Sequence, residues 1–335
     1  LTWIKEHINK LPADYIEIGN SIVRRFEDVQ NSYNRLPKQI IHGTYKHQEI
    51  LVTVTKETSQ VVGFTTFQNV TFTQRIQKLS GLCALASAQN IEPLRAVLPI
   101  VAGFCSECAL LDNELNHLYL SIQIQLLVST IKEVIDSKGR NENLKNVMAI
   151  SAAASSLIRW SRVDEEFALV RFRESAKKEP HPLRAQFDKV ISEQTFQLKE
   201  LFPTVNLNEV THLDLSVSST WIGHEMDFNN LDWFQFKITQ LQAKNPSKII
   251  AGGYLEPRSL YTDDSFDTVG NFGKQNRSIH LGVDFWLAAG TPVHALLKGE
   301  IVTATYQEQH KNYGGLIILK HTLQDIRFYT LYGHL

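Results

Sequence analysis

The feature that most constrains the fold is a change of hydrophobic period along the chain. In the first 178 residues, apolar side chains recur mainly at helical spacing, and one such stripe comprises Leu115, Leu118, Tyr119, Ile122, Leu126, Leu127 and Ile131. After Gly252-Gly253, short β-branched runs alternate with Gly, Pro, Asp and Asn turns, which is typical of an antiparallel sheet. The sequence therefore predicts an α+β multidomain protein, in which a mostly helical part precedes an antiparallel β domain.

The segment Glu179-Pro-His-Pro182 ends the helical part, because proline cannot continue a helix and restrains the residue before it. We expect three regions: 1–178, a mixed linker region over 179–250, and a β domain over 251–335. Helices are predicted over 1–35, 76–137 with a polar break near 111–113, 142–160, 165–176, 184–201 and 233–242. Strands are predicted over 39–41, 50–54, 61–67, 213–217, 291–295, 299–303, 315–320 and 326–332.

Charge and cysteine content narrow the functional class. The 335 residues include 34 Lys plus Arg and 35 Asp plus Glu, for a net charge of -1, which gives no support to nucleic-acid binding or adhesion to an anionic membrane. No uninterrupted apolar run reaches the roughly 18 residues of a spanning helix. The odd, sparse set Cys83, Cys105 and Cys108 argues against a disulfide framework and predicts a cytoplasmic protein. The chain starts and stops inside regular patterns, so we expect a fragment of a longer polypeptide.

A motif series in the first part consists of a strand, His42-Gly-Thr-Tyr-Lys-His-Gln-Glu49, a second strand, a turn, and a third strand with Gly63-Phe-Thr-Thr-Phe67. Residues 1–178 thereby resemble the C-terminal lobe of the aminoglycoside phosphotransferase superfamily, closest to its hydroxylysine kinase-like branch. The family's catalytic loop begins with His, here His42. Its catalytic Asp is replaced by Thr44, and its two metal-binding residues are replaced by Glu49 and Thr66. Phosphoryl transfer depends on Mg²⁺ and on an Asp that orients the nucleophile, so the resemblance implies a kinase-like lobe that has lost its catalytic residues.

The second motif pairs His280 with Asp284. Imidazole nitrogen and carboxylate oxygen are ligands suited to Zn²⁺, and Gly282 allows the backbone between them to turn. By itself this spacing recurs by chance in many proteins.

Ordered blocks around that pair make it specific: Arg277-Ser-Ile-His-Leu-Gly-Val-Asp284, Ala289-Gly-Thr-Pro-Val293, Gly299-Glu-Ile-Val302, Tyr313-Gly-Gly-Leu-Ile-Ile-Leu-Lys-His321 and Tyr329-Thr-Leu-Tyr-Gly-His-Leu335. The series resembles the lysostaphin-like zinc metallopeptidase family, which hydrolyses peptide bonds in peptidoglycan. The resemblance implies that His280 and Asp284 are the first two zinc ligands. It implies that His334 is a catalytic histidine that flanks the metal-bound water and helps to stabilise the oxyanion.

The family's third ligand is the second His of a His-x-His motif downstream of the Tyr-x-His-Leu strand, beyond residue 335. With two ligands we expect poor zinc affinity and an inactive fragment, because a hydrolytic zinc site has three protein ligands and an open position. Among the other histidines, His321 is expected to be structural and His294 to face solvent or pack on the sheet. Cys105-Ser-Glu-Cys108 has redox or zinc spacing but no second pair, so buried small hydrophobes are expected there.

A kinase-like lobe followed by a lysostaphin-like domain resembles a fusion that continues into a class III aminotransferase. That resemblance implies pyridoxal phosphate in a downstream domain, outside this chain, and homo-oligomers formed through that domain. Three functions stay open: a zinc-peptidase-like module acting on a small-molecule or peptide substrate, a non-catalytic scaffold or regulatory part of the aminotransferase fusion, and an active small-molecule kinase. Arg258, in Tyr254-Leu-Glu-Pro-Arg258, precedes the β blocks without an assigned role.

Overall fold

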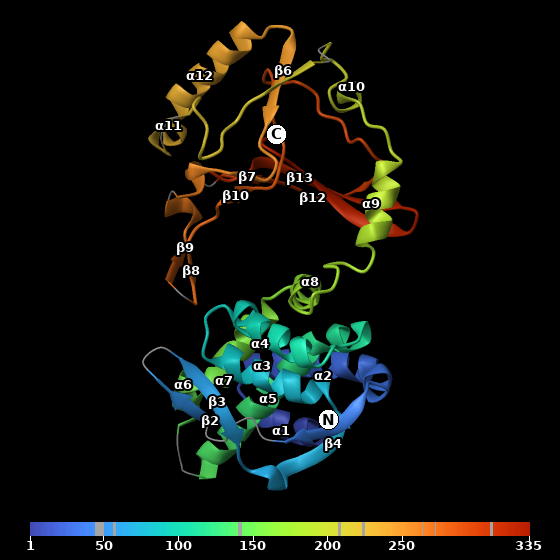
Figure 1. Ribbon diagram of the computed structural model, residues 1–335, viewed down its shortest axis with the longest axis vertical. Coiled ribbons are helices and arrows are strands. Elements are labelled where there is room, and N and C mark those ends of the chain that lie inside the picture. Colours follow the sequence, from blue (N-terminus) through green and yellow to red (C-terminus); the bar gives the residue numbers. More distant parts are fainter. Residues whose placement is uncertain are drawn as a thin grey trace. The chain divides into compact units, whose positions relative to one another are not determined.

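The chain divides into two compact units, Leu1–Pro182 and Leu183–Leu335, which are described separately (Figure 1). The computed structural model describes residues 1–43, 50–55, 58–139, 143–206, 209–222, 225–262, 264–271, 273–308 and 311–335. Residues 183–250, predicted as a mixed linker region, lie within the second unit.

The first unit is mostly helical, as the hydrophobic period predicts. Its helices are α1 (Thr2–His7), η1 (Ile8–Lys10), α2 (Ala13–Asn34), α3 (Ile76–Ala88), α4 (Pro93–Glu107), α5 (Asp112–Gly139), α6 (Leu144–Ile150), α7 (Ala152–Ser161) and α8 (Glu165–Ser175). The helix predicted over 142–160 is two helices, because Ser151 leaves the helical conformation and its side chain caps α7 by accepting a hydrogen bond from Ala154 N. Asp164 caps α8 in the same way, accepting from Phe167 N.

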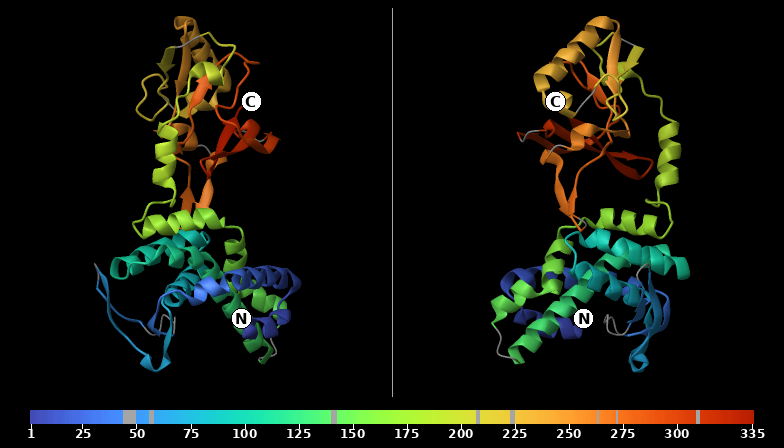
Figure 2. Two further views of the ribbon diagram at one scale, coloured as in Figure 1. Left: turned by 90° about the vertical axis from the view of Figure 1, so that its right-hand side faces the viewer. Right: turned by 60° about the vertical axis from the view of Figure 1, so that its left-hand side comes forward.

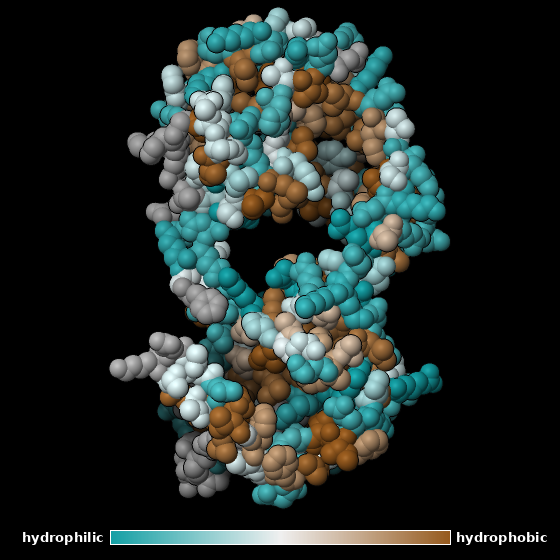
Figure 3. Space-filling view, in the orientation of Figure 1, coloured by the Kyte–Doolittle hydropathy of each residue, from teal (hydrophilic) through white to brown (hydrophobic). Residues whose placement is uncertain are grey.

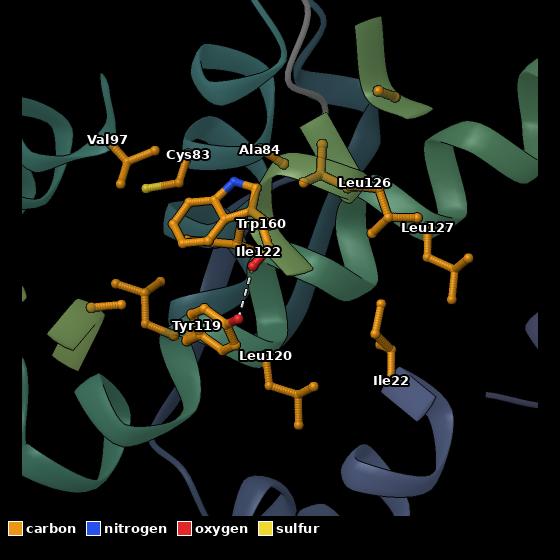
Figure 4. Packing of buried hydrophobic residues seen from close by; sticks show 14 of the residues in the cluster. Ile22, Cys83, Ala84, Val97, Tyr119, Leu120, Ile122, Leu126, Leu127 and Trp160 are labelled. Atoms are coloured by element: carbon orange, nitrogen blue, oxygen red, sulfur yellow. Dashed lines mark hydrogen bonds between the residues drawn. The ribbon is translucent and has the colours of Figure 1, made fainter. Parts of the chain in front are cut away.

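The predicted apolar stripe of α5 lies at the centre of this unit's core. Trp160 and Phe172 are the largest fully buried side chains that pack around it. The Tyr119 hydroxyl donates to the carbonyl oxygen of Trp160 at 2.9 Å, which satisfies a buried polar group beside the indole ring (Figure 4).

Among the described residues, one helix is long and apolar enough to cross a membrane, and that helix is α5. Polar side chains are interspersed along α5, so it contains no uninterrupted apolar run of membrane-spanning length. Within the helical unit 61% of its most apolar window is buried, so packing in the core accounts for its composition.

The strands of the first unit form two separate pairs. β1 (Lys38–His42) pairs with β4 (Val70–Gln74), and β2 (Ile50–Val54) pairs with β3 (Ser59–Phe64), both antiparallel. The prediction missed β4, and it extended β3 too far, because Thr66 adopts a left-handed conformation with φ 66° and ψ 43°. After β3, η3 (Phe67–Asn69) leads into β4. Several apolar side chains of these strands reach the surface, among them Ile40 and Phe72, which face each other across β1 and β4. Hydrophobic side chains on the visible face of this unit appear brown in Figure 3.

The second unit begins with α9 (Arg184–Ser192) and α10 (Leu198–Leu201), then β5 (Glu209–His212), α11 (Glu225–Asn229), α12 (Leu231–Lys244) and β6 (Lys248–Gly252). β5 and β6 pair in parallel, and α11 and α12 lie in the connection that parallel strands require. β11 (Asp284–Trp286) adds to the other edge of β6 in the antiparallel sense. A small core of Leu213, Leu215, Ile222, Phe228, Ile238 and Ile250 packs here.

The remaining strands are antiparallel, as expected. β7 (Glu256–Pro257) pairs with β10 (Ile279–His280), and β8 (Thr268–Gly270) pairs with β9 (Gly273–Gln275). The short helices η4 (Ser259–Thr262) and η5 (Asp264–Phe266) lie between β7 and β8. β12 (Glu300–Gln307), β13 (Gly314–Leu323) and β14 (Ile326–Gly333) form a three-stranded meander, drawn in red in Figure 2.

Three predicted elements of this unit are wrong. Residues 213–217 lie outside any strand, because the Asp214 side chain accepts from Ser216 N and offers the backbone a local partner. The helix predicted over 184–201 breaks between α9 and α10. Residues 291–295 make no strand, since the Thr291 hydroxyl donates to Ala288 O in a turn.

Candidate functional site

Strand pairing in the second unit brings the predicted ligands His280 and Asp284 together. His280 ends β10 and lies opposite Glu256 of β7, while Asp284 begins β11 and lies opposite Gly252 of β6. The three residues between the two ligands therefore turn the chain from one strand pair into another. This geometry places both side chains beside Gly253, which follows β6.

The imidazole of His280 is held through Nδ1, which lies 2.7 Å from Gly253 O. A carbonyl oxygen only accepts, so Nδ1 carries a proton, and in the neutral ring Nε2 is the nitrogen with the lone pair. His280 Nε2 lies 3.5 Å from Asp284 Oδ1. A metal-binding histidine commonly has this arrangement, in which the second nitrogen donates to a carbonyl and fixes the tautomer.

The separation of these two atoms fits zinc. Bonds of about 2.1 Å at a tetrahedral angle place two ligand atoms about 3.4 Å apart. The 3.5 Å between Nε2 and Oδ1 matches that spacing and exceeds the usual length of a direct hydrogen bond. His280 and Asp284 thus fit two of the positions around a tetrahedral ion.

The second oxygen of Asp284 is already bound to protein. Arg258 Nη2 donates to Asp284 Oδ2 at 2.7 Å, and Arg258 Nε donates to Glu256 Oε2 at 2.6 Å. Sequence reasoning noted Arg258 without a role and missed Glu256. The available signal was their spacing, because residues two apart in an extended segment project to the same side.

Gly253 is required at the centre of this group. Its φ of +103° is one that L side chains rarely adopt, and a Cβ there would lie 2.2 Å from Arg258 Nη2, 2.7 Å from His280 Nδ1 and 3.2 Å from Asp284 Oδ2. A side chain at this position would therefore collide with the groups that hold both candidate ligands.

Two tyrosines extend the surroundings of the site. Burial raises the pKa of the Tyr261 hydroxyl above its ordinary value, while Arg258 lowers this pKa and Asp284 raises it. Tyr313 also raises the pKa of Tyr261, so Tyr261 lies in the electrostatic environment of both Asp284 and Tyr313.

His334, the predicted catalytic histidine, follows β14 in a left-handed conformation with φ 59°. Its backbone N donates to Tyr313 O at 2.7 Å, and the centroids of the two rings lie 6.0 Å apart. Gly333 allows this packing, because a Cβ there would lie 2.6 Å from the Tyr313 ring. Within the described ranges, no hydrogen bond, ion pair or ring contact joins His334 to His280 or Asp284, so its catalytic role stays a prediction.

No group of three His, Cys, Asp or Glu side chains suited to a metal occurs among the residues that the structure describes. His321, expected to be structural, is buried. Its Nδ1 donates to Lys298 O at 2.9 Å, and its Nε2 accepts from the Thr330 hydroxyl at 2.8 Å. Both ring nitrogens are therefore engaged. His294 was expected either to face solvent or to pack on the sheet, and the structure shows it exposed.

Two of the four kinase-like positions lie close together. His42 Nε2 lies 2.7 Å from Thr65 O, next to Thr66 with its left-handed backbone. Thr44 and Glu49 lie outside the described residues. The phosphotransferase resemblance thus stays a prediction.

The cysteines are free thiols. Cys83 is buried in the helical core, and Arg75 Nη1 donates to Cys108 Sγ at 3.1 Å. Burial raises the pKa of the Cys105 thiol, which disfavours the reactive thiolate.

The comparisons with known proteins bear on the end of the chain. No curated protein and no solved structure matches it. These comparisons therefore give no support to the kinase-like lobe or to the aminotransferase fusion. The model of peptidase family M23 matches residues 278–335, the stretch that contains His280, Asp284 and His334. This match confirms the lysostaphin-like resemblance of that stretch: residues 278–335 are similar to peptidase family M23.

Proposed function

We propose that this domain belongs to a zinc-dependent hydrolase of peptide bonds, with His280 and Asp284 as two of the zinc ligands. The observation that carries the proposal is the 3.5 Å between His280 Nε2 and Asp284 Oδ1, with Nδ1 occupied by Gly253 O. The family match over residues 278–335 supports the same assignment.

The two ligands and His334 have separate tasks in this proposal. Zinc supplies Lewis acidity when bound, which makes a water molecule acidic enough to act as a nucleophile near neutral pH. His280 contributes a neutral nitrogen and Asp284 a negative oxygen. His334 offers an imidazole that holds or donates a proton beside the substrate peptide.

Zinc titration followed by calorimetry tests the ligand assignment. The chain is expected to bind Zn²⁺ weakly, because it offers two ligands, and His280→Ala and Asp284→Ala are each expected to weaken binding at least tenfold. His294→Ala is the matched control, since this exposed histidine of the same unit is not a proposed ligand. Equal zinc affinity in all four proteins would contradict the proposal.

Peptidase activity is tested on the chain with an added C-terminal extension that carries a His-x-His motif. We expect hydrolysis of a fluorogenic peptide mixture with zinc, and none in the His334→Ala variant. Absence of hydrolysis at full zinc occupancy would reject the catalytic part of the proposal.

A non-catalytic scaffold is the second candidate, and the lack of a three-ligand group in the described part of the chain favours it. In that case the unit serves a downstream enzyme, for which the sequence suggests an aminotransferase. His280→Ala would then leave the activity of the parent protein and the thermal stability of this unit unchanged.

A further inference from the structure

Glu256, Arg258 and Asp284 form a continuous chain of charge-assisted hydrogen bonds behind the candidate ligands. Beyond the bonds between these three side chains, Glu256 Oε1 accepts from Leu215 N at 2.6 Å. Arg258 is also fixed through its backbone, whose N donates to Ser278 O at 3.0 Å. The guanidinium is therefore anchored to the sheet and to the small core of this unit.

Burial of these three ionic side chains carries a desolvation cost, which packing alone does not explain. The Arg258 side chain is 6% exposed and that of Glu256 is 7% exposed, whereas Asp284 at the end of the chain is 27% exposed. Buried ionic groups often contribute little net stability, because desolvation offsets their attraction. The least buried of the three side chains is Asp284, and its Oδ1 faces His280 Nε2 at 3.5 Å.

A carboxylate that is free to rotate can present either or both of its oxygens. With Oδ2 bound to Arg258, Asp284 directs Oδ1 alone toward His280 Nε2. Resting on the function proposed above, we propose that Arg258 is a positioning residue of the zinc site, oriented by Glu256, that holds Asp284 as a single-oxygen ligand. Glu256 and Arg258 both lie before the matched family segment, which begins at residue 278.

The positioning role depends on the two fixed N–H donors of the guanidinium, which a simple positive charge does not provide. Arg258 uses Nε for Glu256 and Nη2 for Asp284, and a lysine ammonium has no such fixed pair of donors. Arg258→Lys therefore keeps the charge and loses the geometry. Glu256→Gln keeps an acceptor for Leu215 N and removes the charge that orients Arg258.

The test is titration of the full chain with Zn²⁺ alone, followed by calorimetry. Arg258→Lys is expected to bind zinc about 10–100-fold more weakly, the range seen when an outer partner of a ligand is removed. Glu256→Gln is expected to weaken zinc binding less. Arg327→Lys is the matched control, since Arg327 is an exposed arginine of the same unit outside the candidate site, and it should bind zinc like the wild type.

Loss of stability alone must not explain the result. Ile238→Val, a change in the small core away from the ionic chain, should lower the melting temperature and leave zinc affinity unchanged. If Arg258→Lys fails to fold, Glu256→Gln carries the test. Weakened zinc binding in Ile238→Val equal to that in the ionic variants would overturn the positioning role.

The outcomes separate this inference from the proposed function. Wild-type zinc affinity in Arg258→Lys and Glu256→Gln, with weakened binding in His280→Ala, would overturn the role of Arg258 and leave the zinc site in place. Wild-type affinity in His280→Ala and Asp284→Ala would reject the zinc site and, with it, the role of Arg258.

Discussion

Gly253 is the residue on which the candidate site most depends. Three side chains of the candidate site lie within 3.2 Å of the position where its Cβ would be, and its φ of +103° excludes most other residues. The carbonyl oxygen of Gly253 also fixes the tautomer of His280. One glycine thus provides a close approach, an unusual backbone conformation and a hydrogen-bond acceptor.

We predict that Gly253→Ala lowers both the stability of the second unit and its zinc affinity. The backbone strain costs about 1–3 kcal/mol, and the collision displaces Arg258 and His280. Gly273→Ala is the matched control, because Gly273 has a φ of +105° with nothing within 4 Å. It should lose stability through strain and keep its zinc affinity, as urea unfolding and calorimetry would measure. Equal zinc affinities in the two variants would show that the space around Gly253 is not needed.

Among the elements, the meander of β12, β13 and β14 positions His334 and depends on His321. His321 of β13 connects Lys298, which precedes β12, with Thr330 of β14, and its ring stacks on Phe328 with centroids 5.0 Å apart. Gly299 leaves room for this ring, since a Cβ there would lie 2.8 Å from it. The histidine therefore links β13 to β14 and to the segment that leads into β12.

Replacing His321 by Leu should destabilise the second unit by about 1–3 kcal/mol, because the polar partners of the ring lose their hydrogen bonds. Zinc affinity should not change, because both ring nitrogens are used within the sheet. Urea unfolding and zinc titration of the same sample check both statements. A variant that keeps its stability and loses zinc would instead identify His321 as a ligand.

At the scale of the whole molecule, each of the two units is stabilised by a hydrophobic core of its own. The helical unit is built around α5, with Trp160 and Phe172 fully buried, and the second unit has its own smaller core around Ile238 and Ile250. No residue is shared between these cores, so each unit is expected to respond to changes in its own interior.

Trp160→Ala should lower the unfolding free energy of the first unit by about 3–5 kcal/mol through loss of burial and formation of a cavity. The thermal transition of the second unit should stay in place in differential scanning calorimetry. Ile238→Ala should show the reverse pattern. A single transition that moves with either substitution would contradict the independence of the two units.

Acid should remove stabilising contributions in both units. Lys178 and then Arg173 hold the pKa of Asp112 below 3.8, and hydrogen bonds from Ser216 lower the pKa of Asp214. A lowered folded-state pKa contributes stability above the unfolded-state pKa, and this is lost as the pH falls through the folded-state value.

Asp112→Asn and Asp214→Asn should therefore destabilise their units at pH 7 and have smaller effects below pH 3.8. Urea unfolding between pH 7 and acid measures this. The Asp112 effect should shrink in a Lys178→Met background, and an effect that grows toward acid would contradict the assigned charge state.

Much of the architecture follows from local pattern. The helical period predicts α2, α5 and α8, and the alternation of β-branched runs with turns predicts β12, β13 and β14. These elements follow from the sequence because each depends on the spacing of neighbouring apolar residues. β4 and all the strands from β5 to β11 were missed, because short strands are stabilised by their partners. Residues 213–217 were misassigned because Asp214 offers its backbone a local alternative.

The ordered motifs of the sequence identified His280, Asp284 and His334 as candidate site residues. They also indicated the family to which residues 278–335 are similar. The 3.5 Å spacing, the role of Gly253 and the chain from Glu256 through Arg258 to Asp284 came from the folded structure. Arg258 and Asp284 are separated by 26 residues along the chain. Whether these two side chains meet depends on the register of β7 with β10 and of β6 with β11. Register is set by the packing of whole strands, so the sequence near Arg258 or near Asp284 does not determine it.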